Sequence, residues 1–128
     1  MNSKQLGVLG EKIALKYLKN KGYQILGKNY LPKFISGPQK GEIDIIARKK
    51  GIISFVEVKA LAESGRNVFS PEDKVNFSKQ KKIIKMAEFW LTEKKIPLES
   101  KWQIDVIAIR VQPDFKKAKI NFFENIGF

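Results

Sequence analysis

The sequence predicts a single α/β domain, with elements in the order helix, three strands, helix, one or two strands. Its length of 128 residues lies in the usual range for one domain, and 43% hydrophobic residues can supply a core. Apolar residues recur at helical spacing in two segments and form short β-rich runs elsewhere. We find no internal repeat, low-complexity tract or linker, so we expect residues 1–128 to form one domain.

The first segments are predicted to be a helix and a strand. Apolar residues at three- and four-residue steps predict an amphipathic helix over about residues 4–21, which Gly22 ends. Residues 23–30 read as a strand, and the Pro- and Gly-containing segment 31–40 is expected to be an exposed loop.

A hairpin is predicted next. Residues 43–48 and 52–59 are β-rich runs on either side of Lys50-Gly51, a pair typical of a tight antiparallel turn. The following residues, 60–76, have no periodicity and form the longest expected loop, and loops of this length are often functional.

The last third is predicted to contain a helix and two strands. Helical spacing returns at Phe77 and ends before Pro97. Residues 102–111 read as a buried strand and residues 119–123 as an edge strand.

Charge and missing residue types narrow the possible functions. The chain has 25 Lys and Arg against 13 Asp and Glu, a formal net charge of +12, which favours a polyanionic partner such as nucleic acid. Cys and His are both absent. This excludes disulfides, zinc sites of thiolate or imidazole, cysteine nucleophiles and nucleases with a histidine base. Carboxylates, lysines, hydroxyls, main-chain groups and hard metal ions remain.

Nothing in the sequence indicates a membrane protein. No uncharged stretch approaches the roughly 20 apolar residues of a spanning helix. The N-terminal segment also lacks the continuous apolar stretch of a secretory signal. We therefore expect a cytoplasmic protein.

Four charged residues interrupt apolar patterns. Glu11 falls near the apolar side of its helix and is expected to point inward, although an acid in a first helical turn is also favoured by the helix dipole. Asp44 lies between isoleucines, and Glu57 and Lys59 share one face of a strand while Val58 points to the other. Each could be a solvated surface charge taken alone, but the combination indicates a site.

The turn at Lys50-Gly51 determines how the two strand acids meet. A two-residue turn pairs residues whose numbers sum to 101, and Asp44 then lies opposite Glu57. A three-residue turn would bring Val56 there instead. Two facing carboxylates repel each other unless a proton or a cation intervenes, and a divalent ion with Lys59 beside it would remove the conflict.

These motifs resemble the YraN family, a bacterial group with a Holliday-junction-resolvase-like, PD-(D/E)xK nuclease fold. The resemblance is strongest over residues 41–47 (GEIDIIA) and 55–59 (FVEVK), and it extends over nearly the whole chain. Ile43 stands where the superfamily name has proline. Further similar positions are Gly10-Glu11, Gly22-Tyr23, Asn29, Lys79-Gln80 and Ile104-Asp105-Val106.

The resemblance implies a restriction-endonuclease-like core, with a central mixed sheet of four to five strands flanked by helices. It implies that Asp44 and Glu57 bind Mg²⁺ or Mn²⁺, that Lys59 is the motif lysine and that Glu11 is the acid of the first helix. The main-chain carbonyl of Val58 would be a further ligand. Lys59 would orient water or stabilise negative charge, and it could act as a base only if burial lowers its pKa.

Other residues have less specific expected roles. Glu11 would hold a water of the ion or bind a second ion, and Gly7 and Gly10 would let a phosphate backbone approach. Gln80 is expected either to point at the site or to make a buried structural hydrogen bond. Asp105 is expected to be structural or to support the site residues, and not to bind the ion. Four lysines would contact phosphates, or form a solvated face: Lys79, Lys81, Lys82 and Lys85. Three aromatic residues could stack on bases, with core packing the safer expectation: Phe34, Phe69 and Phe77.

We therefore expect a metal-dependent endonuclease that acts on DNA, by family analogy on branched or structured DNA in repair or recombination. The alternatives are a non-catalytic nucleic-acid-binding module of the same fold and, with weaker support, a protein that binds anionic membrane surfaces. A homodimer is left open.

Overall fold

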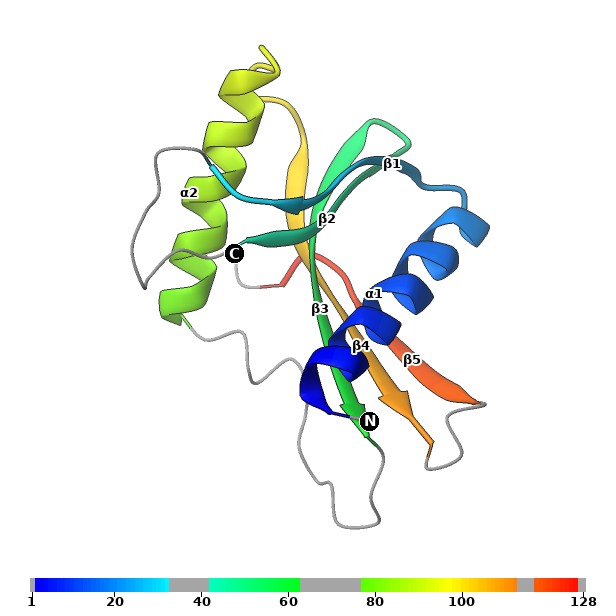
Figure 1. Ribbon diagram of the computed structural model, residues 1–128. Helices are drawn as coiled ribbons and strands as arrows, with labels where there is room; N and C mark the ends of the chain where they lie inside the picture. Colours follow the sequence, from blue (N-terminus) through cyan, green and yellow to red (C-terminus); the bar gives the residue numbers. More distant parts are fainter. Residues whose placement is uncertain (1, 33–41, 63–76, 113–116, 127–128) are drawn as a thin grey trace.

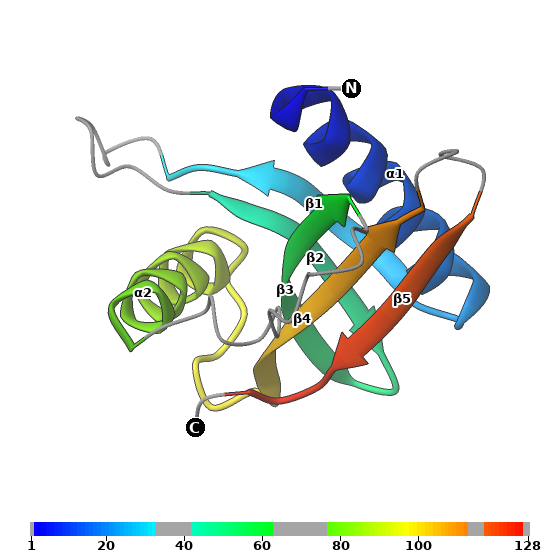
Figure 2. The ribbon, with the colours of Figure 1, turned by 90° about the horizontal axis from the view of Figure 1, so that it is seen from below.

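A computed structural model of the chain describes residues 2–32, 42–62, 77–112 and 117–126. In these residues a five-stranded mixed sheet lies between two helices, which pack on opposite faces (Figures 1 and 2). This order and arrangement match the prediction and are consistent with a restriction-endonuclease-like core. The elements are α1 (Ser3–Asn20), β1 (Gln24–Tyr30), β2 (Ile43–Lys49), β3 (Ile52–Ala62), α2 (Phe77–Glu93), β4 (Trp102–Val111) and β5 (Ala118–Phe123).

Helix α1 begins with a reciprocal cap. The side chain of Asn2 accepts a hydrogen bond from the main-chain N–H of Gln5 at 2.8 Å, and the Gln5 side chain accepts one from the N–H of Asn2 at 3.0 Å. Further along, a Cβ on Gly10 would lie 2.6 Å from the Cβ of Ala60 in β3. Gly10 therefore permits close helix–strand packing, which corrects the expectation that it opens room for phosphate.

The β2–β3 hairpin has the predicted two-residue turn. Lys50 and Gly51 have φ values of 51° and 77°, as a type I′ turn requires. The paired residues, from Lys49 with Ile52 onward, have numbers that sum to 101. The register that brings Asp44 and Glu57 together is thus fixed by this turn.

The sheet order is β1-β2-β3-β4-β5, with β3 and β4 parallel and the other neighbours antiparallel. Helix α2 lies in the crossover that a parallel pair needs. Strand β3 extends beyond its predicted end to Ala62, because pairing with β4 continues to Val111. The rest of the predicted loop lies outside the described residues, as does most of the predicted loop 31–40.

The core has two halves, one on each face of the sheet. On the α2 side, the ring of Phe55 packs edge-on against Trp90 and Trp102, with centroids 5.7 and 5.6 Å apart. On the α1 side, Val56 packs with Leu18 and other buried residues. Because side chains alternate along β3, the residue that follows Val56 faces α2. Neither described helix combines the length and apolar composition needed to cross a membrane.

Candidate active site at the fork of strands β2 and β3

The candidate site lies where β2 and β3 stop pairing. The ladder between these strands ends at Ile45 and Val56, and the same register carries Asp44 to the position opposite Glu57. The carboxylate of Asp44 accepts a hydrogen bond from the main-chain N–H of Val58, with 2.8 Å between Oδ2 and N. The Asp44 side chain thus provides an acceptor for a main-chain N–H of β3 that lies beyond the last residue pair of the two strands. This hydrogen bond holds Asp44 at the fork.

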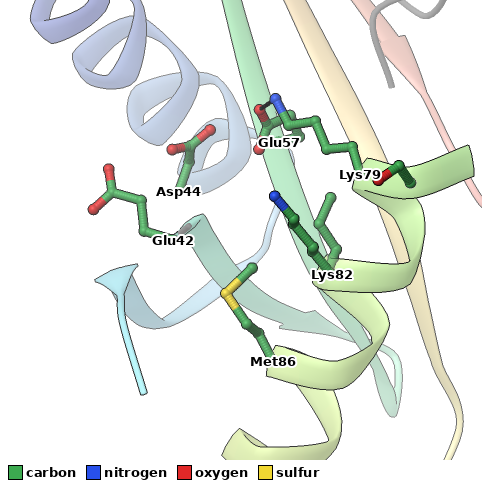
Figure 3. A pocket seen from close by; sticks show the side chains of 8 residues that line it. Glu42, Asp44, Glu57, Lys79, Lys82 and Met86 are labelled. Atoms are coloured by element: carbon green, nitrogen blue, oxygen red, sulfur yellow. Dashed lines mark ion pairs between the residues drawn. The ribbon is translucent and has the colours of Figure 1, made fainter. Parts of the chain in front are cut away.

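Glu57 is buried and ion-paired to two lysines. Only 6% of its surface is exposed. Its Oε1 atom lies 3.1 Å from Nζ of Lys59 and 2.5 Å from Nζ of Lys79, which comes from the first turn of α2 (Figure 3). Glu57 and Lys59 thus lie on one strand face, as predicted, and form an ion pair. Lys79, for which a phosphate contact or a solvated face was expected, is half-buried on this carboxylate.

The two strand acids repel each other, as their register predicts. Burial raises the pKa of Asp44 to about 8, and the negative charge of Glu57 contributes in the same direction, while the hydrogen bond from Val58 opposes it. At neutral pH Asp44 therefore holds a proton unless a cation compensates its charge.

The pKa values of the two lysines paired with Glu57 shift in opposite directions. Burial lowers the pKa of Lys59, and the neighbouring Lys79 lowers it further, against the attraction of Glu57. Burial also disfavours the charged form of Lys79, but its bonds to Glu57 and Lys59 outweigh burial and raise its pKa. The direction for Lys59 meets the condition under which this lysine could act as a base.

Two more acids meet Asp44 at the fork. One carboxylate oxygen from each of Glu11, Glu42 and Asp44 lies within 4.8 Å of the other two. Glu11 is half-buried, as an inward orientation predicts, and burial followed by the charge of Glu42 raises its pKa. Sequence reasoning missed Glu42 as a site residue. Its position two residues before Asp44, at the start of a strand, was the available signal.

A pocket of about 400 Å³ opens beside these acids. One wall carries the acids of the fork, and the other is helix α2, which contributes Lys79, Lys82 and apolar side chains (Figure 3). An acidic wall thus faces a basic one across a cavity of ligand size. The lining residues are Glu42, Asp44, Glu57, Ser78, Lys79, Lys82, Ile83 and Met86.

The remaining predicted residues lie elsewhere. Gln80 is half-buried, and it is not among the described residues that line the pocket. Lys81 and Lys85 are exposed on α2, as a phosphate-contacting or solvated face requires. Phe34, Phe69 and the side chain of Phe77 fall outside the described part of the chain.

Asp105 has the structural surroundings expected of it. It is completely buried in β4, where its Oδ1 accepts hydrogen bonds from the main-chain N–H of Asn125 at 2.8 Å and from the side-chain amide of Gln103 at 2.9 Å. Burial raises its pKa, and these bonds, with one from Ser54, oppose that rise. Asp105 therefore connects the first half of β4 to the segment that follows β5.

The chain is similar to one group of proteins over nearly its whole length. The model of "Uncharacterised protein family UPF0102" matches residues 10–109. A UPF0102 protein of Alkaliphilus oremlandii is 40% identical over 123 residues, 96% of this chain and 97% of the relative. A UPF0102 protein of Fervidobacterium nodosum is 42% identical over 125 residues, which cover 94% of this chain and 80% of the relative. A UPF0102 protein of Campylobacter hominis is 38% identical over 123 residues, which cover 96% of this chain and 94% of the relative.

Proposed function

The chain belongs to the uncharacterised protein family UPF0102, the YraN family, and we propose that it is a metal-dependent endonuclease that hydrolyses phosphodiester bonds in DNA. By analogy with resolvase-like nucleases, we propose branched or structured DNA as its substrate. The fold alone does not carry this proposal, since one fold supports many functions.

One observation carries it: the carboxylates of Asp44 and Glu57 face each other at the fork, with Lys59 on Glu57. Two acids in contact are unfavourable, as the raised pKa of Asp44 indicates. A protein that only bound a polyanion would gain nothing from carboxylates clustered beside a basic pocket wall. This arrangement is explained if the acids hold a cation.

The donor set fits a hard divalent ion. Mg²⁺ and Mn²⁺ prefer carboxylate and carbonyl oxygens, and the carboxylates of Glu11, Glu42 and Asp44 already converge at the fork. Asp44 and Glu42 of this group would hold the ion together with Glu57, which lies opposite Asp44, and with the carbonyl of Val58. When bound, the ion would neutralise phosphoryl charge and lower the pKa of water.

The residues of the chain would supply the rest of the chemistry. Lys59 would orient the attacking water or stabilise negative charge that develops on the phosphate. Glu11, whose carboxylate lies within 4.8 Å of that of Asp44, would hold a water of the ion or bind a second ion. The exposed lysines of α2 would hold the phosphate backbone without reading the bases.

The decisive experiment is cleavage of plasmid DNA and of a four-way junction with Mg²⁺ or Mn²⁺, against a chelator control. We expect metal-dependent cleavage that a chelator stops. Tight metal-independent binding without cleavage of any tested structure would overturn the proposal.

One observation favours a second candidate, a nucleic-acid-binding module without hydrolytic activity. Glu57 already has two cationic partners, so it needs no metal for charge balance. Such a module would bind DNA with a steep salt dependence, about 0.9 in log–log slope for each neutralised phosphate. Replacement of Lys81, Lys82 and Lys85 by Glu would weaken binding to all sequences alike, and unchanged affinity at low salt would remove α2 from the interface.

A further inference from the structure

We infer that Lys79 competes with a metal ion for Glu57 and thereby sets the metal affinity of the site. The inference rests on the proposed metal site and adds a regulatory role for a residue outside the strand motif. It makes Lys79 a positioning residue, because it would act through Glu57 and not on the substrate.

The competition follows from a shared atom. Nζ of Lys79 and Nζ of Lys59 both contact Oε1 of Glu57, at 2.5 and 3.1 Å. A carboxylate oxygen offers about two lone-pair directions, and these two ammonium groups use them. A metal ion on either oxygen of this carboxylate would lie close to both ammonium groups, and repulsion between cations at such distances is strong. Binding of the ion therefore favours the departure of one ammonium group.

The structure indicates that Lys79 is the group that leaves. Lys59 projects from the same strand face as Glu57, two residues away, so its backbone keeps it beside the carboxylate. Lys79 reaches across the pocket from a different element, and its side chain is 35% exposed against 22% for Lys59. Figure 3 shows the Lys79 side chain extending from α2 to Glu57, and because it is the more exposed of the two lysines it can turn away from the carboxylate at a lower cost.

If Lys79 competes with the ion, removal of its positive charge should increase the metal affinity of the site. Lys79→Gln should strengthen Mn²⁺ binding roughly tenfold, the coupling typical of groups in direct contact. Lys82→Gln is the matched control, because Lys82 lines the same pocket and is exposed. It should change Mn²⁺ affinity about twofold or less, the share expected of a screened charge.

A double-mutant cycle isolates the contact with Glu57. Mn²⁺ affinity is measured by calorimetry, without nucleic acid, for Lys79→Gln alone and in the Glu57→Gln background. We expect the tenfold gain to fall to the size of the Lys82→Gln effect once Glu57 is neutral. A gain that persists in that background would show a general field effect and overturn the inference.

The other outcomes are equally distinct. If Lys79→Gln only lowers the melting temperature and leaves Mn²⁺ affinity unchanged, the ion pair is structural and the inference is wrong while the metal site stands. If neither the wild type nor the variant binds Mn²⁺, the proposed function fails with it. Lys79→Arg, which keeps the charge, should retain wild-type affinity, and Lys79→Met replaces Lys79→Gln should the latter fold poorly.

Discussion

Two buried acids on neighbouring strands have opposite kinds of surroundings. Glu57 in β3 and Asp105 in β4 are 6% and 0% exposed, and parallel pairing sets Val56 beside Asp105 and Val106 beside Glu57. The two carboxylates therefore lie on opposite faces of the sheet. Asp105 accepts hydrogen bonds from neutral main-chain and amide donors, whereas Glu57 meets two ammonium groups and another carboxylate.

The difference separates a structural acid from a chemical one. The donors to Asp105 are neutral, a main-chain N–H and a side-chain amide, and the carboxylate is completely buried. The partners of Glu57 are long, partly exposed side chains beside a pocket, and Asp44 adds a repulsion that folding alone does not remove. Burial is common to both acids, so the kind of partner and not burial identifies the site.

The largest expected effect concerns cleavage. Asp44→Asn and Glu57→Gln should each reduce metal-dependent cleavage on the order of a thousandfold, because each removes a negative ligand while keeping size and fold. DNA affinity should stay equal or rise, since less negative charge faces the phosphates. Single-turnover cleavage and junction binding are the measurements.

Asp105→Asn is the control for that comparison. It also neutralises a buried acid, but it should retain wild-type cleavage. Wild-type cleavage by either site variant, in a preparation free of contaminating nuclease, would mean that the site assignment is wrong.

The next effect separates catalysis from binding at Lys59. Lys59→Met should lower the cleavage rate about a hundredfold with little change in DNA affinity, because the lysine acts on charge that develops only during the reaction. In a binding module the variant would instead lose DNA affinity modestly, and its log–log salt slope would be lower by about 0.9, the contribution of one neutralised phosphate. If melting temperature falls and every activity falls in proportion, Lys59 serves only to neutralise Glu57.

A smaller effect concerns stability. Asp105→Ala should lower the free energy of unfolding by about 1–3 kcal/mol, because it removes the buried acceptor of two hydrogen bonds, from Asn125 and from Gln103. Asp105→Asn keeps an oxygen for both and should cost about 1 kcal/mol or less. Glu57→Ala should also cost less than Asp105→Ala, since the loss of this carboxylate relieves its repulsion with Asp44. Urea unfolding measures all three, and equal losses would contradict the distinction between the two acids.

Local rules in the sequence were sufficient for the elements and the fork. The Lys50-Gly51 pair fixes the hairpin register, and the register brings Asp44 to Glu57 without any tertiary information. The helix periodicity likewise placed Glu11 on the inward side of α1. These features depend on residues close in sequence, which is why they could be predicted.

Contacts between distant elements could not be predicted in the same way. Lys79 forms an ion pair with Glu57 because the crossover between β3 and β4 brings the first turn of α2 near this carboxylate. The rotation of the helix about its axis, which decides which side chains face the strand, cannot be read from the sequence. Gly10 was misread for the same reason, since its close neighbour Ala60 is on another element. Glu42 was missed because a strand-end acid is usually a solvated charge.

The last expected effect is a dependence of stability on pH that comes from Asp44. The pKa of Asp44 rises from 3.8 to about 8 on folding, so the folded protein binds a proton that the unfolded chain has released. The resulting stabilisation is complete below pH 4 and is lost as pH rises through about 8. In the presence of a chelator, the wild type should therefore lose stability relative to Asp44→Asn between pH 5 and 8.

The melting temperatures of the two proteins test this directly, because their difference isolates one carboxyl from the other titrating groups. We expect the gap to widen by roughly 10–15 °C over this range, because each pH unit between the two pKa values costs the wild type about 1.4 kcal/mol and 1 kcal/mol shifts the melting temperature by about 4 °C in a domain of this size. Saturating Mn²⁺ at pH 8 should reverse the order, because only the wild type retains the full ligand set and binding stabilises the folded state. A gap independent of pH would mean that Asp44 is ionised in the folded protein without a cation, and the argument for a cation at the fork would fail.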